Sequence, residues 1–231
     1  MPNLKILQAA AERRRQMRPK AERLYQQYRD QVPCLIHQLA GPTQQEHDRA
    51  FDLLSQMGET VVSELLDALA DPTLDEIAAD EVVSLLGVTG DDRAREPLWD
   101  FFQAQVDLER ASTAALSLAS LGDDRVLPFL RRTLLDADDE ELVSNAVAAM
   151  VTVGTVDDIP RLREIHRKHL TNWEIRFGIA NVILSIVGET DQSTFNRTLD
   201  DIQASFADRR LWDDIWAILD AQFGAKEVTW H

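Results

Sequence analysis

The stretch GDDRVLPFLRRTLLDADDEELVSNAVAAMVTVG, from Gly122 to Gly154, decides the fold. Both of its halves carry apolar residues at helical spacing, and a short acidic turn separates them. The first apolar face is Leu127, Leu130 and Leu134, and the second is Leu142, Ala146, Ala149, Met150 and Val153. We predict two helices, the second ending at Gly154 in the left-handed conformation that glycine adopts without strain.

The same unit recurs along the chain. Glycines that end a predicted second helix fall at Gly58, Gly90, Gly122, Gly154, Gly188 and Gly224. Their spacings of 32, 32, 32, 34 and 36 residues are typical of a helical repeat array. A proline follows an aliphatic residue at Val32-Pro33, Leu127-Pro128 and Ile159-Pro160, a pair that suits a helix start. The chain is therefore predicted to be all-α, with about six helical hairpins.

The repeat resembles the HEAT-like repeats, in particular the short form named for the phycobilin lyases. The motifs that carry the resemblance are Leu/Val-Pro-x-x-Leu in the first helix and Ala-x-x-x-Leu-x-x-Leu-Gly-Asp in the second, seen here as Ala114 to Asp123. The resemblance covers residues 27–224 and implies an α–α superhelix. Because these motifs are packing positions, it implies less about function.

The two ends of the chain differ from the repeats. Residues 1–30 hold eight Lys and Arg and three Asp and Glu, a net charge of +5 in a chain of net charge −16. We interpret residues 1–26 as a basic helical cap over the first repeat, with a mobile basic arm as the alternative. Pro19 is expected to break or restart this helix. Residues 225–231 are interpreted as a tail.

The strongly acidic composition, with a pI near 4.6, argues against nucleic-acid binding. Most of this charge is interpreted as a solubility feature, and attraction of a protein partner is the alternative. That partner is expected to be basic or to present an apolar helix. No apolar run is long enough to cross a membrane, and no signal peptide is visible, so a cytoplasmic protein is expected. The single cysteine, Cys34, is interpreted as a small core residue.

The search for chemistry finds no catalytic constellation, and we expect no cofactor. His166 and His169 have the spacing of metal ligands on one helical face, but no third ligand accompanies them, so a solvated surface pair is favoured. The acidic run Asp136–Glu141 lacks the spacing of a calcium loop. The doublets Asp91-Asp92, Asp123-Asp124 and Asp157-Asp158 recur at the repeat period and are interpreted as helix caps.

One candidate binding surface is visible in the fifth and sixth repeats. A second apolar series runs along the helix that begins near Trp173, on a different stripe from the core positions, and continues into the sixth repeat. Either neighbouring helices cover this series, or it forms an exposed docking groove for a partner helix. The candidate protein-binding residues are Trp173, Ile175, Ile179, Val182, Ile186, Ile215 and Ile218.

These observations predict a protein-interaction scaffold or assembly chaperone without enzymatic activity. A bilin-lyase-like protein or lyase subunit is the alternative that the repeat type implies. An acidic inhibitor or immunity protein for a basic partner is a further alternative.

Overall fold

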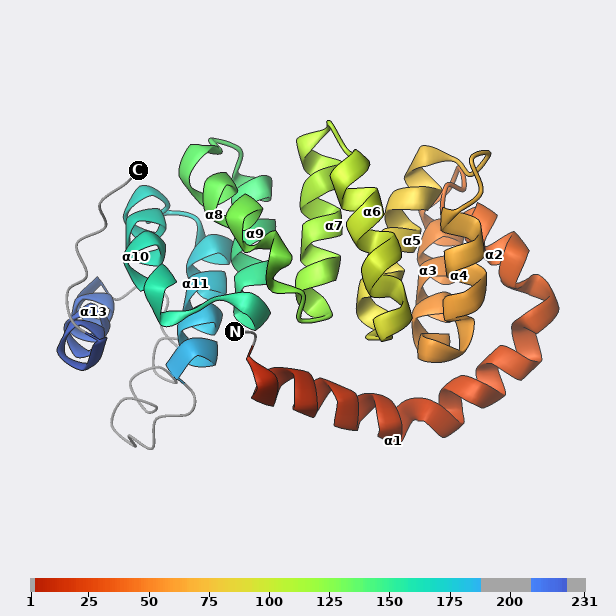
Figure 1. Cartoon of the computed structure of the whole chain (residues 1–231), viewed down its shortest axis with the longest axis horizontal. Helices are drawn as coiled ribbons and strands as arrows, with labels where there is room; N and C mark the ends of the chain where they lie inside the picture. Colours follow the sequence, from red (N-terminus) through yellow and green to blue (C-terminus); the bar gives the residue numbers. More distant parts are fainter. Residues whose placement is uncertain (1–2, 188–208, 224–231) are drawn as a thin grey trace. The chain divides into compact units, whose positions relative to one another are not determined.

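The computed structural model describes residues 3–187 and 209–223, and no strand occurs among them. The chain divides into two compact units, one of residues 4–123 and one of residues 1–3 with 124–231. The all-α prediction is confirmed by helical hairpins that pack against their neighbours within each unit (Figure 1). The first helix of the sixth repeat, Gly188 and Gly224 lie outside the described residues.

Five complete hairpins are described. Those of the N-terminal unit are α2 (Val32–Gln38) with α3 (Gln44–Met57), α4 (Val62–Leu69) with α5 (Glu76–Thr89), and α6 (Arg95–Ala104) with α7 (Leu108–Ser120). Those of the C-terminal unit are α8 (Leu127–Asp136) with α9 (Glu140–Val153), and α10 (Ile159–Lys168) with α11 (Trp173–Val187). A single-turn 3₁₀ helix precedes each first helix.

Helix starts follow the local sequence. The three prolines of the aliphatic-proline pairs occupy the first turns of α2, α8 and α10, where a missing N–H loses no partner. All five described second helices begin at a side-chain cap, which accepts hydrogen bonds from orphan backbone N–H groups. For α11 the cap is Asn172, which accepts from the N–H groups of Glu174 and Ile175. The other four caps are Thr43, Asp75, Asp107 and Asp139.

Glycine ends the second helices, but in two different ways. Gly58, Gly90 and Gly122 have positive φ angles of 53°, 67° and 76°. The left-handed conformation predicted at Gly154 is wrong: its φ is −61° and its backbone is extended. Glycine is still required there, because a Cβ atom would lie 2.4 Å from the Met150 carbonyl oxygen. The sequence pattern marked the helix end without distinguishing these two reasons.

The N-terminal helix α1 (Leu4–Tyr28) is a strap rather than a cap over the first repeat alone. It is continuous through Pro19, so the predicted break is wrong, and Figure 1 shows it as a long curved helix along the ends of the hairpins of its unit. A Cβ on Gly122 would meet Leu7, and a Cβ on Gly90 would meet the Arg14 guanidinium. The strap therefore reaches the third and second hairpins as well as the first.

The spacing of the inward-facing residues along α1 matches the distance between neighbouring hairpins. Leu7, Arg14 and Ala21 are seven residues apart, which is a rise of about 10.5 Å in an α-helix. Helices that pack side by side are about 8–10 Å apart. Seven residues of α1 therefore span one hairpin. The order is reversed: Leu7 faces Gly122 of the third hairpin, and Arg14 faces Gly90 of the second, 32 residues earlier in the chain. Ala21 is the only fully buried residue of α1, and its other inward apolar side chains, such as Ile6, Leu7 and Leu24, are partly buried.

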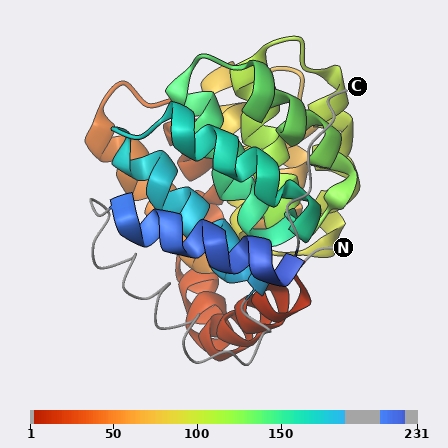
Figure 2. The same ribbon diagram turned by 90° about the vertical axis from the view of Figure 1, so that its left-hand side faces the viewer.

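The C-terminal unit is built on the pair α9 and α11. Gly178 allows their close approach, because a Cβ there would lie 2.7 Å from Val147. Asn3 belongs to this unit: its backbone N–H donates to the Thr152 carbonyl oxygen at 2.7 Å, and its side chain donates to Ser185 Oγ at 2.9 Å. Helix α13 (Arg209–Phe223) lies against α10 and α11 (Figure 2).

Two of the three aspartate doublets, Asp91-Asp92 and Asp157-Asp158, act at helix starts as predicted. Asp91 accepts from the Arg93 backbone N–H at 2.9 Å, and Asp158 accepts from the backbone N–H and hydroxyl of Thr155 in a capping box. Asp158 is buried and also receives a two-pronged contact from Arg131, at 2.7 and 3.0 Å. This second partner explains how a carboxylate is kept away from water in the C-terminal unit.

Two further expectations concern exposure. Cys34 is exposed, so its interpretation as a core residue is wrong: the neighbouring Leu35 and Ile36 occupy the inward face of the short helix α2. No helix in the described part of the chain combines the length and the apolar character that a bilayer crossing needs.

Candidate functional site

The apolar series of α11 is covered, so the first of the two alternatives holds and no exposed groove runs along it. Ile175, Ile179 and Val182 are each 0% exposed, and Ile215 of α13 is equally buried. Ile186 and Ile218 are partly buried. The cause is the position of α11, which packs against α9 and against α13 within the C-terminal unit. Of the seven candidate residues, Trp173 alone is largely exposed, at 60%.

A cluster of aromatic and basic side chains fastens α13. Arg163 forms a bidentate ion pair with Asp220, with N–O distances of 3.0 and 2.9 Å, and also donates to the Trp216 carbonyl oxygen at 3.0 Å. Its guanidinium lies 5.1 Å from the Trp216 ring centre. Asp220, which departs from the apolar residues at its repeat position, thus has a specific partner.

His166 is part of this cluster and is not a surface residue. It is 5% exposed, and its ring centre lies 4.1 Å from that of Trp212. The predicted solvated pair with His169 is therefore wrong, because α13 covers His166. Burial, together with the positive charge of Arg176, lowers the pKa of His166 to about 4, so the imidazole is neutral near pH 7. We assign this cluster a structural role.

The exposed apolar residues of the C-terminal unit gather where α11 begins. We call Leu170, Trp173 and Phe177 the aromatic ridge. Trp173 and Phe177 are one turn apart on α11, and Leu170 lies in the turn before it. Their exposed fractions are 47%, 60% and 37%. Trp173 came from the sequence analysis, whereas Leu170 and Phe177 were missed because no repeat position marks them as outward-facing.

Carboxylates lie beside the aromatic ridge. Glu140, the first residue of α9, accepts from Asn172 Nδ2 at 2.9 Å and lies 3.4 Å from His169 Nδ1. These contacts join the turn between α8 and α9 to the turn between α10 and α11. We call the acidic side chains at these two turns the acidic rim; its members are Asp136, Asp138, Asp139, Glu140, Glu141 and Glu174, all exposed.

Most of the acidic rim is not used by the fold. Asp139 caps α9, and Glu140 makes the contacts just described. The other four carboxylates form no hydrogen bond or ion pair through their side chains with the residues that the structure describes. They are therefore available to an outside cation. Within residues 3–187 and 209–223, no three His, Cys, Asp or Glu side chains are placed so that they could hold one metal ion.

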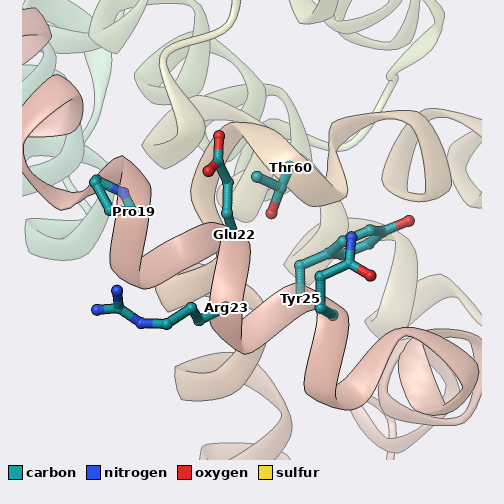
Figure 3. A pocket seen from close by; sticks show the side chains of 6 residues that line it. Pro19, Glu22, Arg23, Tyr25 and Thr60 are labelled. Atoms are coloured by element: carbon teal, nitrogen blue, oxygen red, sulfur yellow. The ribbon is translucent and has the colours of Figure 1, made fainter.

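A pocket in the N-terminal unit is the other candidate site, and residues at the bend of α1 line it. Its volume is about 740 Å³, and Figure 3 shows Glu22 on the side of α1 nearer Thr60, with Arg23 pointing away. Tyr25 lines it and donates a hydrogen bond to Glu64. The remaining lining residues, Pro19, Glu22, Arg23 and Gln26, are exposed. Such an open, mixed lining offers a ligand little enclosure, so we rank the aromatic ridge above it.

Comparison with protein-family models and with curated proteins gave no match for this chain.

Proposed function

We propose that this protein is a non-enzymatic interaction module, a scaffold or assembly chaperone, that binds another protein through the aromatic ridge. The observation that supports this most directly is the 60% exposure of Trp173 next to two further exposed apolar side chains. Tryptophan is enriched among the residues that dominate the energy of protein interfaces. Exposing it in water, where burial would be favourable, is a cost that a binding role explains.

The fold supports the same proposal. Stacked helical hairpins present long side-chain surfaces to partners. The second helix of a hairpin is held firmly by its neighbours, as the fully buried stripe of α11 illustrates. A ridge that projects from such a helix is pre-organised, so that binding immobilises few additional side chains.

Site-specific crosslinking in the native host tests this proposal. A photoactivatable phenylalanine analogue is placed at position 173 and, in a matched sample, at position 108. Leu108 is the ideal control, since it is the first residue of α7 as Trp173 is of α11, and it is 59% exposed. We expect a specific protein to be crosslinked from position 173 and lost when Phe177→Ser and Leu170→Ser are added. Equal labelling from both positions, or none from position 173, contradicts the proposal.

A further inference from the structure

The charge around the aromatic ridge identifies the chemistry of its partner. Five of the six residues from Asp136 to Glu141 are acidic, and Glu174 directly follows Trp173. The whole chain has a net charge of −16. An anionic partner segment would be repelled at this surface, and a neutral one would leave the free carboxylates unpaired.

Basic residues near the ridge do not neutralise this charge. Arg176 turns its Nη1 to the Leu170 carbonyl oxygen at 3.3 Å, and its guanidinium lies 5.7 Å from the Trp212 ring centre. Lys168 is directed to Glu164, at 4.0 Å. His169 lies beside Glu140. Arg176 and Lys168 are thus engaged. Arg132 and Arg167 are exposed nearby, but two cations do not neutralise the four unengaged carboxylates Asp136, Asp138, Glu141 and Glu174.

We infer that the aromatic ridge and the acidic rim together bind a Lys/Arg-rich segment of a partner protein. An ammonium or guanidinium group can lie over the face of the exposed Trp173 indole, where the ring quadrupole attracts it. The alkyl stem of the same side chain covers Leu170 or Phe177. Neighbouring Lys and Arg side chains pair with the acidic rim. This inference rests on the proposed function and specifies the partner's chemistry.

Peptide binding measured by fluorescence anisotropy on the full chain tests the inference. The probe is a dye-labelled synthetic peptide of Lys, Arg and Leu, and its comparison is the same peptide with every Lys and Arg replaced by Gln. We expect the cationic peptide to bind and the Gln peptide to bind at least about tenfold more weakly. Affinity for the cationic peptide should fall by about tenfold as salt rises from about 50 to about 300 mM.

Two variants locate the binding. Trp173→Ser removes the indole, and a triple variant removes three free carboxylates: Asp138→Asn, Glu141→Gln and Glu174→Gln. Each is expected to weaken cationic-peptide binding by roughly threefold to tenfold. The matched control removes three exposed carboxylates of the N-terminal unit, in Asp67→Asn, Asp100→Asn and Glu109→Gln. It changes the net charge equally and should leave the affinity within about twofold.

The alternative outcomes are separable. Equal weakening by the two triple variants would show a general charge effect and overturn the inference. Equal binding of the Gln peptide would also overturn it, while leaving the proposed function intact if crosslinking from position 173 succeeds. Self-association of the chain that Trp173→Ser abolishes, measured by sedimentation, would assign the ridge to a second copy and overturn the inference as well. Failure of the crosslinking experiment alone would count against the proposed function.

Discussion

Arg163 joins α10 to α13 by a bidentate ion pair with Asp220, in which Nη1 and Nη2 lie 3.0 and 2.9 Å from the two carboxylate oxygens. The Arg163 side chain is 19% exposed, and it lies over the Trp216 ring. One side chain thus supplies an ion pair, a hydrogen bond to a backbone carbonyl and a cation–π contact. These contacts hold α13 against α10, where Trp212 and Trp216 pack on the buried His166.

Arg163→Met should therefore loosen α13. We expect a loss of about 1–3 kcal/mol in the free energy of unfolding of the C-terminal unit, because Asp220 and the partly buried Trp216 carbonyl oxygen both lose their hydrogen-bond donor. Urea unfolding followed by tryptophan fluorescence measures this loss, since Trp212 and Trp216 lie in the cluster. Arg15→Met is the control, because the side chains of the Arg15–Glu12 pair are 79% and 58% exposed and the pair should contribute less than about 1 kcal/mol. Equal effects of the two substitutions would contradict the role of Arg163.

His166 should make the stability of the C-terminal unit depend on pH. Its folded-state pKa is about 4, below the ordinary value of 6.5, so the unfolded chain binds more protons between these values. Its stabilising contribution is complete above about pH 6.5 and is lost as the pH falls toward about 4. Arg176 and Arg167 oppose the charged imidazole, and Asp213 favours it.

Unfolding free energies measured across this pH window test the effect of His166. His166→Phe keeps an aromatic ring against Trp212 but cannot titrate. We expect the wild type to lose on the order of a few kcal/mol relative to this variant as the pH falls. Parallel pH profiles for the two proteins would mean that His166 does not remain neutral and buried in the folded chain.

The hairpins could be predicted from the sequence because the residues that start, pack and end their helices recur at a regular spacing. The prolines at the starts of α2, α8 and α10, the caps of the second helices and the glycines at their ends all reflect local backbone chemistry, which is legible in a single chain. The extended backbone conformation of Gly154 could not be predicted from the sequence, because a helix ends at glycine for more than one physical reason.

The candidate site was predicted less well than the hairpins. The second apolar stripe of α11 was found, but a stripe looks the same whether a partner or α13 covers it, and the structure shows it covered. His166 was placed in solvent because its partners Trp212 and Trp216 lie more than forty residues away in the sequence. Asp220 occupies the position that holds Leu or Met in the other five repeats, and the structure shows its partner, Arg163, which comes from a different hairpin.

A coupling between Gly122 and Leu7 should report the contact of the strap with the third hairpin. Gly122→Ala is expected to cost about 1–2 kcal/mol, because its φ is 76° and alanine resists positive φ. The new Cβ would also lie 2.6 Å from Leu7 Cδ1. In a Leu7→Ala background the added crowding disappears, so the cost of Gly122→Ala should fall. Strictly additive effects in this double-mutant cycle would mean that Leu7 does not contact Gly122.

The strap itself should open more readily than the hairpins that it crosses. Ala21 is its one fully buried residue and the apolar side chains Leu7 and Leu24 are only partly buried, so detaching α1 exposes less buried apolar surface than unfolding a hairpin helix such as α5. Native-state hydrogen exchange should therefore give α1 amides a lower opening free energy than those of α5, whose stripe from Val82 to Leu86 is buried.

The strap is also held by exposed polar contacts that salt weakens. Lys20 lies 3.3 Å from Gln56, and Arg18 lies 3.2 Å from Glu59. Raising the salt concentration should accordingly accelerate exchange in α1 and leave α5 unchanged. Protection of α1 equal to that of α5 at all salt concentrations would show that the strap and the hairpins open together, as one cooperative body.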